Sequence, residues 1–484
     1  RDGLVTGVQT CALPIYWVAA MDERVTVAVP VSSATSYEWW IKGDYAWDHH
    51  QRPAGLREFA DIGTLYAMTA PRPLLLVNGR PEMESMPVPA AMQSYEYGRA
   101  VYKLYGREKA IAFRESETGH GYKTDKRVLL YRWLNEWLFG GKIPQGTADL
   151  PFTPEPRDNL AVGLPQGNLN IQKLYRQWLN ETEPPALPSG LGQAKEFQAT
   201  RRASLARLLN RIEPDAKPKE YLRDDYAAQS GDYRAERLEL EVAPDLLLPA
   251  IFVRKQGPSR HKTILYLDKA RGTAPETAQL LDLGYAILFF DPRGTGEADW
   301  GGTRTSNWAL LVGRPPVGMW AEDISKAATY ALGRADVESV AVVGRGAFGK
   351  AALYAAGLDT RLAAACVTTD TLSYRQEANS GTEHIFADVP GILRWGDIAQ
   401  VAALVAPRPL AVFSAGLPMP SPGYYISMPR FEISKETVPE AALRENYAWT
   451  AKFYELFGAG ARFRAGSGDP DFSRTVVDWL RSNY

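Results

Sequence analysis

The chain is poor in the residues that mark specialised classes of protein. Only two of its 484 residues are cysteines, Cys11 and Cys366, which excludes a disulfide framework and a cysteine-rich zinc site. The sequence has no uninterrupted apolar run of about 18 residues, so it contains no predicted membrane span. It also lacks an excess of positive charge, because 55 Lys and Arg residues face 56 Asp and Glu residues. We therefore expect neither nucleic acid nor a membrane among its partners.

The remaining composition is that of a globular protein rich in aromatic residues. Hydrophobic residues make up 45% of the chain and charged residues 23%, which excludes a disordered or collagen-like protein. There are 13 Trp and 24 Tyr residues. Their flat surfaces suit sugar-like ligands, but large aromatic side chains also fill large cores. Both interpretations remain open at this point.

Residues 1–15 (RDGLVTGVQTCALPI) are unusual for a protein N-terminus. The chain begins with Arg rather than Met, and the segment lacks the basic, apolar and small-residue regions of a signal peptide. The string resembles translated sequencing-adapter read-through at the end of a metagenomic fragment. We interpret residues 1–15 as a non-native, adapter-derived segment that stands in place of the true N-terminal part. A genuine but odd loop is the alternative.

Two parts of the chain repeat each other in the same order and at near-constant spacing. Residues 20–37 align without a gap with residues 357–374, so Asp22 matches Asp359 and Tyr37 matches Tyr374. Three further pairs of segments match: 61–74 with 397–410, 101–106 with 453–458, and 131–138 with 477–484. This repeat predicts a tandem duplication. We expect residues 74–77 and 410–413 to occupy the same position in their sheets.

The repeat divides the chain into four predicted segments. After residues 1–15 come the C-terminal half of a first domain (16–141), a Pro- and Gly-rich linker (142–193) and a second, more complete domain (194–484). One amphipathic helix is predicted inside the linker, near 171–179. The Arg-rich helix at 200–211 opens the second domain, and we expect its charged face to be solvated.

The second domain alternates short apolar runs with helical patterns. Predicted strands are 238–242, 248–253, 263–267, 286–290, 340–343 and 364–368, and predicted helices include 320–332 and 351–357. Buried strands separated by amphipathic helices indicate an α/β fold with a parallel, doubly wound sheet. Residues 340–362 then form a strand, a tight Gly turn and a helix. That turn could be a dinucleotide-binding loop, but its late place in the sheet favours the nucleophile turn of a hydrolase.

Three motifs together resemble the acetylxylan-esterase-like branch of the α/β-hydrolases, which is related to carbohydrate esterases and prolyl oligopeptidases. They are residues 340–374, the APRPL that precedes a late strand, and the GHGY that precedes a helix. The resemblance covers most of residues 17–140 and 195–484. It implies two α/β-hydrolase-like doubly wound sheets, the first only a C-terminal half. It further implies a Ser nucleophile, an acidic residue after the late strand, a His on the last loop and no cofactor, in a secreted or periplasmic protein.

Transferred to this sequence, those roles divide unevenly between the two domains. In the second domain Gly346 stands at the nucleophile position, the loop 414–420 has no carboxylate, and Asp469 replaces the His. We therefore expect a catalytically inactive pseudoenzyme domain. In the first domain His120 holds the general-base position. The acid is expected in the loop 80–87, as Glu82 or, second, Glu84, within hydrogen-bond reach of the imidazole.

The nucleophile of the first domain is expected to be absent. Asp359 minus Asp22 gives an offset of 337, so Gly346 corresponds to Gln9, inside the adapter-like segment. A separate cluster at 37–53 contains Asp44, Asp48, His49 and His50. It could be a metal site, a substrate-facing loop or an ordinary packed loop. Adjacent histidines point in different directions, so we predict no metal.

The leading hypothesis is a serine carboxylic-ester hydrolase acting on acylated carbohydrate or another small ester, in which this chain is inactive because its nucleophile segment is missing. One alternative is a non-catalytic carbohydrate-binding or scaffolding pseudo-hydrolase. Another is a prolyl-oligopeptidase-like serine peptidase, although the sequence shows no propeller-type repeats. The sequence leaves the oligomeric state open.

Overall fold

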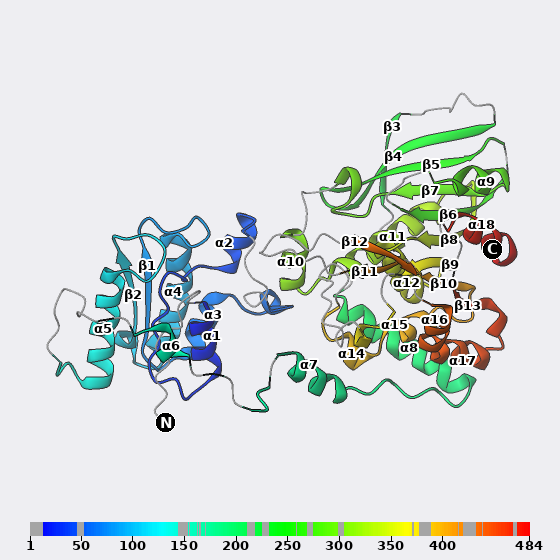
Figure 1. The fold of residues 1–484 in the computed structure, drawn as a ribbon. Helices are drawn as coiled ribbons and strands as arrows, with labels where there is room; N and C mark the ends of the chain where they lie inside the picture. Colours follow the sequence, from blue (N-terminus) through cyan, green and yellow to red (C-terminus); the bar gives the residue numbers. More distant parts are fainter. Residues whose placement is uncertain are drawn as a thin grey trace. The chain divides into compact units, whose positions relative to one another are not determined.

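The computed structural model describes two compact units, which are treated separately below (Figure 1). Unit 1 comprises residues 1–168 with 310–313, and unit 2 comprises residues 169–309 with 314–484. The description covers the chain except residues 1–12, 46–52, 144–152, 154, 162, 164–165, 170, 211–217, 225–231, 258, 269–273, 299–303, 370–371, 377–388, 415, 420–431, 438 and 468–471.

Unit 2 is built on a nine-stranded mixed sheet of order β13-β10-β9-β8-β6-β7-β5-β4-β3. The six strands from β13 to β7 are parallel, and β5, β4 and β3 extend the sheet as antiparallel neighbours. All six strands predicted from the sequence lie within this sheet. The strands are β3 (Lys219–Asp224), β4 (Tyr233–Ala243), β5 (Leu246–Lys255), β6 (His261–Leu267), β7 (Ala286–Phe290), β8 (Val337–Gly344), β9 (Leu362–Thr369), β10 (Leu410–Ser414) and β13 (Phe463–Gly466).

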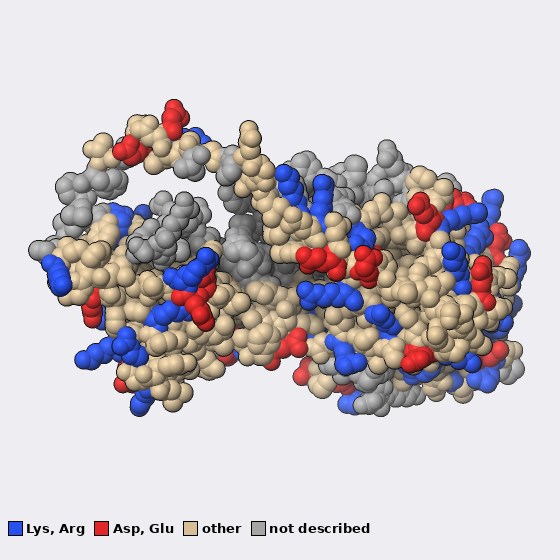
Figure 2. All heavy atoms as spheres, turned by 90° about the horizontal axis from the view of Figure 1, so that it is seen from below, with Lys and Arg blue, Asp and Glu red and all other residues tan. Residues whose placement is uncertain are grey.

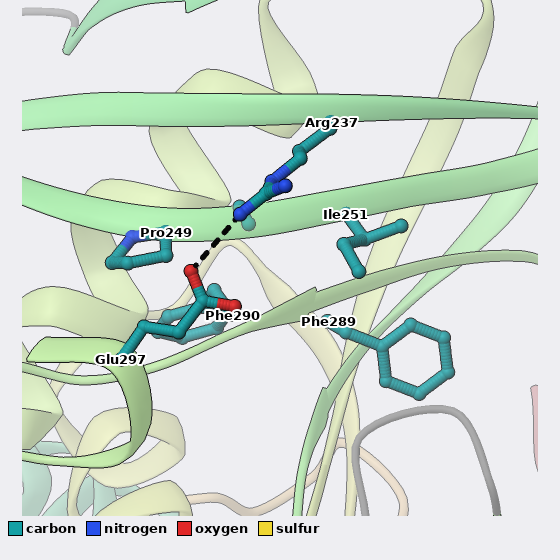
Figure 3. Close-up of a pocket in the computed structure, with 7 residues that line it drawn as sticks. Arg237, Pro249, Ile251, Phe289, Phe290 and Glu297 are labelled. Carbon is teal, nitrogen blue, oxygen red and sulfur yellow. Dashed lines mark hydrogen bonds and ion pairs between the residues drawn. The ribbon is translucent and has the colours of Figure 1, made fainter. Parts of the chain in front are cut away.

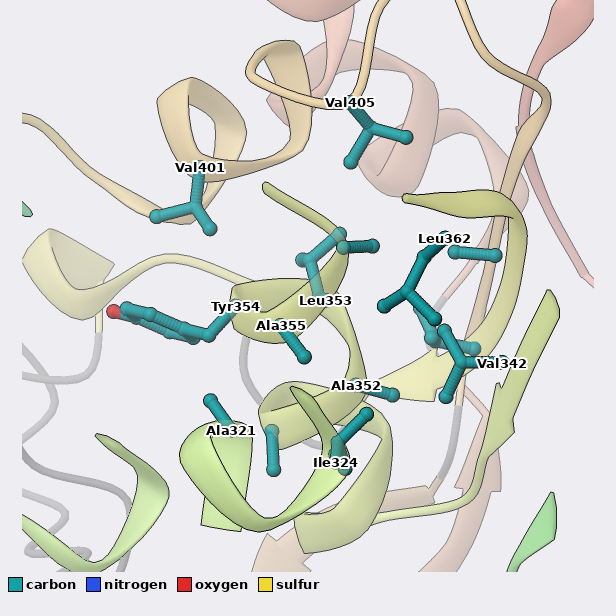
Figure 4. Close-up of a cluster of buried hydrophobic side chains, with 14 of the residues drawn as sticks. Ala321, Ile324, Val342, Ala352, Leu353, Tyr354, Ala355, Leu362, Val401 and Val405 are labelled. Atoms are coloured by element: carbon teal, nitrogen blue, oxygen red, sulfur yellow. The ribbon is translucent and has the colours of Figure 1, made fainter. Parts of the chain in front are cut away.

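Helices cover both faces of this sheet because successive strand side chains point to opposite sides. One core cluster joins Leu265 and Val342 of the strands to α8, α11, α12, α15 and α17, and Figure 4 shows part of it. The other joins Ile264 and Val343 to α9 and α18. The elements are α8 (Leu191–Leu208), α9 (Glu276–Asp282), η4 (Gly296–Ala298), α10 (Arg304–Leu311), α11 (Pro316–Leu332), α12 (Ala347–Leu358), α14 (Ile392–Trp395), α15 (Ile398–Ala403), β11 (Gly416–Met419), β12 (Glu432–Thr437), α16 (Glu440–Asn446), α17 (Ala448–Leu456), η5 (Gly460–Arg462) and α18 (Ser473–Asn483).

Unit 1 has a smaller sheet, in which β1 (Leu74–Gly79) and β2 (Ile111–Ser116) run parallel. Bridges from Ala28 to Leu74 and from Val31 to Val77 place a further extended segment beside β1. Helix α5 (Thr124–Phe139) packs on one face, where Trp133 meets Leu75 and Val77. The other elements are α1 (Leu13–Met21), α2 (Tyr37–Lys42), η2 (Leu56–Glu58), α3 (Ile62–Thr69), α4 (Val88–Leu104), η3 (Glu108–Ala110) and α6 (Arg157–Leu160), and α7 (Ile171–Asn180) begins unit 2.

Strands β1 and β10 have matching neighbours in the two units. Residues 28 and 31 pair with β1 at Leu74 and Val77, and residues 365 and 368, which lie 337 positions further on, pair with β10 at Leu410 and Phe413. On the other edge β1 pairs with β2 and β10 pairs with β13. The expected correspondence of residues 74–77 with 410–413 is therefore present.

A capping aspartate ties a loop to a helix in the same way in each unit. Asp61 caps α3 and accepts hydrogen bonds from the backbone N–H groups of Ile62 (2.6 Å) and Tyr37 (2.8 Å). Asp397 caps α15 and accepts from Ile398 (2.7 Å) and Tyr374 (2.8 Å). Both form capping boxes, which satisfy backbone donors that a helix start leaves unpaired.

A partly buried arginine makes a second shared set of contacts. Arg408 donates to the carbonyl oxygens of Ala356 (2.6 Å), Asp359 (3.0 Å) and Leu362 (2.6 Å). Arg72 in unit 1 donates to the carbonyls at the three matching positions, which are Ala19 (2.6 Å), Asp22 (3.0 Å) and Val25 (2.8 Å). Each arginine therefore joins the start of a strand to the end of a helix that precedes it in the chain.

Two details of the sequence prediction need correction. The Arg-rich helix begins at Leu191 and ends at Leu208, whereas it was expected at 200–211. Its face is not simply solvated, because Arg201 donates to the carbonyl of Trp395 and Arg202 to those of Gly357 and Leu404. The predicted linker helix is present as α7, and the carbonyl of Leu179 at its end accepts a bond from Arg375 of unit 2 (2.7 Å).

The surface carries charges of both signs. On the face shown in Figure 2, Lys and Arg side chains are interspersed with Asp and Glu side chains. This distribution agrees with the near-zero net charge of the sequence. In the part of the chain that the structure describes, no helix combines the length and the apolar character needed to cross a membrane.

We predict that Arg408→Met will destabilise unit 2 by about 3 kcal/mol, because buried carbonyl groups lose their donor. Burial lowers the pKa of Arg408 to about 10, so the guanidinium is still charged at neutral pH. The measurement is the urea midpoint of the transition that exposes β10. Pulsed hydrogen exchange with mass spectrometry monitors that transition. Arg462→Met is the control, because Arg462 is exposed and makes one long bond to Pro407 (3.4 Å). Equal midpoints for the two variants would contradict the role given to Arg408.

Candidate active site

His120 and Glu82 form a hydrogen-bonded pair at the carboxyl ends of β1 and β2. The Nδ1 atom of His120 lies 2.7 Å from Oε1 of Glu82. Glu82 belongs to the loop after β1, and His120 belongs to the loop between β2 and α5. Because β1 and β2 are parallel neighbours, these two loops leave the sheet at the same edge. The structure thus brings together the two residues expected from the sequence.

The exposures of the two side chains differ in a way that suits a base and its orienting acid. The side chain of His120 is 42% exposed, whereas that of Glu82 is fully buried. A carboxylate at Nδ1 favours the imidazole tautomer with its proton on Nδ1. Nε2 is then the nitrogen with a free lone pair, and that is the atom that could accept a proton from a substrate or a nucleophile.

Glu82 is held in its charged form by its surroundings. Burial alone would raise the pKa of its carboxyl group, but three interactions outweigh burial and lower the pKa. The backbone N–H of Gly79 donates to Oε2 (3.0 Å), the ammonium group of Lys126 lies 3.3 Å from the same oxygen, and His120 binds Oε1. Both carboxylate oxygens therefore have partners.

Lys126 connects this carboxylate to the histidine loop. The side chain of Lys126 is fully buried and comes from the first turn of α5. Its Nζ donates to the carbonyl of Gly119 (2.6 Å) and to Oγ of Ser32 (2.6 Å), in addition to Glu82. The backbone N–H of Gly121 also donates to Ser32 Oγ (3.2 Å). One lysine thus positions both the acid and the loop that carries the base.

A close approach of two backbones completes this arrangement. A Cβ atom on Gly79 would lie 2.0 Å from the carbonyl oxygen of Thr118, which no real side chain tolerates. Glycine at the end of β1 therefore allows the histidine loop to lie directly over the strand. Thr118 is held in turn by its hydroxyl, which donates to Asp125 of α5 (2.8 Å).

The other candidate residues of the sequence analysis have different outcomes. Glu84, the second choice for the acid, is exposed, and its backbone carbonyl accepts a bond from Trp39 Nε1 (2.9 Å). Asp48, His49 and His50 lie outside the described residues, as do Gln9 and Asp469. Among the residues that the structure does describe, no group of three or more His, Cys, Asp or Glu side chains is arranged to hold a metal ion.

In unit 2 the turn that the sequence predicts to be a nucleophile turn has Gly346 at its centre. Gly346 has φ 58° and ψ −126° at the start of α12, directly after β8. Its N–H donates to Oγ1 of Thr368 (2.9 Å) at the end of the next strand. Among the described residues, no atom lies within 4 Å of a Cβ atom built on Gly346.

Unit 2 also has a small pocket between β4, β5 and the end of β7 (Figure 3). Figure 3 shows Arg237 and Glu297 facing each other across it, as an ion pair at 3.3 Å. The remaining lining residues are apolar: Pro249, Ala250, Ile251, Phe289 and Phe290. This pocket does not contain a residue that the sequence analysis proposed for catalysis.

No family model and no curated protein matches the chain by sequence. A solved structure described as a proposed acetyl xylan esterase from Bacteroides fragilis resembles it with a TM-score of 0.52 at 14% identity, covering 65% of this chain and 95% of its own. CE15 glucuronoyl esterases from Teredinibacter turnerae and Solibacter usitatus have TM-scores of 0.43 and 0.44 at 17% and 16% identity. They cover 60% and 63% of this chain and 85% and 99% of their own.

The similarity to the Bacteroides fragilis protein shows that this chain shares the mixed α/β fold of that structure over 65% of its length. It confirms the fold that the sequence motifs implied. At this level of identity the similarity concerns the fold and not the substrate.

Lys126 and Ser32 are the members of the site that the sequence analysis missed. Lys126 lies among Asp125 and Arg127, where a run of charges normally indicates a solvated helix start. Its burial depends on contacts with the loop at 119–121 and with Glu82. Both partners lie outside the helix, so the sequence pattern did not indicate these contacts. Ser32 gave no signal because it has neither a motif nor a flanking glycine.

We predict that Glu82→Gln will destabilise unit 1 by about 3 kcal/mol at pH 7, because it leaves the buried ammonium group of Lys126 without a counter-charge. The folded state lowers the pKa of Glu82, so the stabilisation is present above the unfolded pKa near 4.5 and is lost as the pH falls. The difference from the unchanged chain should therefore shrink from pH 6 to below about pH 4. The measurement is the midpoint urea concentration at which β1 becomes exposed, monitored by pulsed hydrogen exchange and mass spectrometry. The exchange pulse is given at the same pH for every sample.

Glu84→Gln is the matched control, because Glu84 lies two residues away and is exposed. It should leave the midpoint unchanged at every pH. A pH-independent difference for Glu82→Gln would mean that the carboxylate is not the charged partner of Lys126.

Proposed function

We propose that His120 and Glu82 are the base and the acid of a Ser–His–Glu triad in a serine carboxylic-ester hydrolase that acts on acylated carbohydrate. The observation that carries the proposal is the 2.7 Å contact between His120 Nδ1 and Glu82 Oε1 at the carboxyl edge of the sheet. The Bacteroides fragilis protein with the same fold, which is described as a proposed acetyl xylan esterase, supports the substrate class. The charged state of Glu82 supports its role beside an imidazole that must gain a proton.

In this mechanism His120 transfers the protons and Glu82 supports it. Nε2 of His120 removes the proton of a serine hydroxyl as that oxygen attacks the acyl carbonyl carbon. Glu82 stabilises the imidazolium that forms and keeps its ring oriented through Nδ1. The imidazolium then protonates the sugar oxygen as its bond to the acyl carbon breaks. A water molecule, deprotonated by the same nitrogen, attacks the acyl-serine ester and releases the carboxylic acid and the serine. No cofactor takes part in this scheme.

We propose further that the chain as given is inactive and that its two domains are copies of one ancestral domain. The four segments 1–15, 16–141, 142–193 and 194–484 remain our proposal for its organisation. Matching contacts of Arg72 with Arg408 and of Asp61 with Asp397 support the duplication. Gly346 at one nucleophile position, and Gln9 at the position that corresponds to it, support the inactivity.

A second candidate function is a non-catalytic carbohydrate-binding or scaffolding role for unit 2. It is favoured by the turn at Gly346, which has φ 58° and ψ −126° although glycine cannot attack a carbonyl. The peptidase alternative gains no comparable support from the described residues.

We predict that this chain will not hydrolyse p-nitrophenyl acetate or acetylated xylo-oligosaccharides above a buffer blank. Loss of a triad nucleophile costs about a millionfold in turnover, even when the base and the acid remain. The measurement is the initial rate at pH 7 to 8, together with labelling by a fluorophosphonate probe, which should be absent.

His120→Ala is the control for a nucleophile that has not been identified in the chain. If the chain shows turnover that His120→Ala abolishes, a nucleophile is present and the proposed inactivity is wrong. If turnover persists in His120→Ala, the assignment of His120 as the base is wrong.

A further inference from the structure

Helix α4 of unit 1 exposes an apolar stripe that a folded domain normally covers. Tyr97 is 57% exposed, Leu104 84% and Tyr105 59%, and Val101 lies between them, half-buried. Tyr97, Val101 and Leu104 are spaced by three, four or seven positions, and Tyr105, the residue directly after the helix, follows Val101 by four, so they lie on one face. We call these four residues the α4 stripe. Met68, at the end of the adjacent α3, is 48% exposed.

The equivalent face of unit 2 is covered by helix α8. A shift of 352 positions places α4 (Val88–Leu104) on α16 and α17, which together span 440–456, and η3 on η5. The stripe residues Tyr97, Val101 and Tyr105 then correspond to Trp449, Phe453 and Phe457.

Phe197 of α8 packs on this equivalent aromatic face. Its ring lies 5.4 Å from that of Trp449 and 5.5 Å from that of Phe453. The counterpart of Met68, Leu404, is fully buried. Apolar patches of this kind mark interaction sites when they remain exposed.

The polar contacts of α8 show which hydrogen-bond donors a helix that covers this face carries. Gln198 Nε2 donates to the carbonyls of Ala403 (3.1 Å) and Ala406 (2.8 Å) at the end of α15. Arg202 donates to the carbonyls of Gly357 (2.9 Å) and Leu404. Burial lowers the pKa of Arg202, and carbonyl oxygens replace its water.

Unit 1 presents the same acceptors in the same backbone setting. The carbonyl groups of Ala67, Met68, Ala70 and Ala20 stand at the positions matching those four acceptors. Arg72 fixes the turn after α3 against the end of α1, as Arg408 fixes the corresponding elements of unit 2. The apolar stripe and the acceptors therefore form one surface, like the surface that α8 covers.

We propose that the α4 stripe and the end of α3 bind an amphipathic helix with the chemistry of α8, provided by a separate polypeptide segment. That helix carries an aromatic residue, a glutamine directly after it and an arginine four residues further on, as in Phe197, Gln198 and Arg202. The aromatic side chain packs against Tyr97 and Val101, and the two polar side chains donate to the carbonyls of α3 and α1.

The test uses the full chain and a fluorescein-labelled peptide of residues 189–210, acetylated and amidated at its ends. Fluorescence anisotropy should show saturable binding, and Tyr97→Ala in the protein should weaken it about tenfold or more. Tyr105→Ala should act in the same direction, so the result does not depend on one variant. Phe139→Ala is the matched control, because Phe139 is 51% exposed on α5, and it should leave binding unchanged.

Peptide variants test the stated chemistry. Phe197→Ala in the peptide, and separately Gln198→Ala with Arg202→Ala, should each weaken binding about tenfold. Absence of saturable binding up to about 1 mM peptide overturns the proposal. Binding that ignores Tyr97→Ala but is lost in Trp449→Ala also overturns it, because the peptide then exchanges with α8 of unit 2.

A measurement of the oligomeric state distinguishes the proposed helix from a second copy of the chain as the partner that covers the α4 stripe. If sedimentation velocity shows a dimer of the chain that Tyr97→Ala dissociates, a second copy covers the stripe and the proposed partner is wrong. A monomer that binds the peptide at one site supports the proposal.

Discussion

Much of each unit depends on the hydrogen bonds that one arginine donates to the backbone. This arginine is Arg72 in unit 1 and Arg408 in unit 2. Each donates to three backbone carbonyls that follow or end a helix, and each lies two residues before a central strand. An arginine can do this because its guanidinium has five donors in a rigid plane. The start of the strand is thereby fixed against the preceding helix. The other end of β1 carries Glu82, so the position of the candidate acid is set by a contact at the far end of the same strand.

At that end of β1 a second buried cation, Lys126, fixes the chemistry of the site. Its ammonium group bonds to Glu82, to the carbonyl of Gly119 and to Ser32, and so it joins α5, the loop after β1 and the loop that carries His120. The desolvation of the carboxylate is offset by this charge and by the Gly79 N–H. The carboxylate consequently stays ionised and keeps one oxygen directed at the imidazole, which is the arrangement a general base requires.

The sequence predicted those features that are local or repeated. Strands such as 286–290 form continuous apolar runs, so their bounds agree with β7, and the resemblance to a known family located His120 and the loop of Glu82. It failed where a side chain acts over distance. Arg202 was expected on a charged, solvated helix face, and Lys126 was not singled out, but both donate to backbone carbonyls that are brought near by the fold. A linear pattern records the charge of such a residue, and it does not record whether carbonyl groups from elsewhere replace the solvent.

The two units share the backbone contacts of one arginine and one aspartate, and they differ in the candidate catalytic residues. Unit 2 keeps the bonds of Arg408 and Asp397 and the turn at Gly346, but its loop after β10, residues 414–420, has no carboxylate. Buried ion pairs add little to stability, and hydrophobic replacements are often neutral or favourable. Stability alone therefore gives no reason to keep Lys126 and Glu82 fully buried beside each other in unit 1. We propose that support of His120 gives that reason, because removal of Glu82 leaves the buried ammonium group without a counter-charge and the imidazole without its orienting carboxylate.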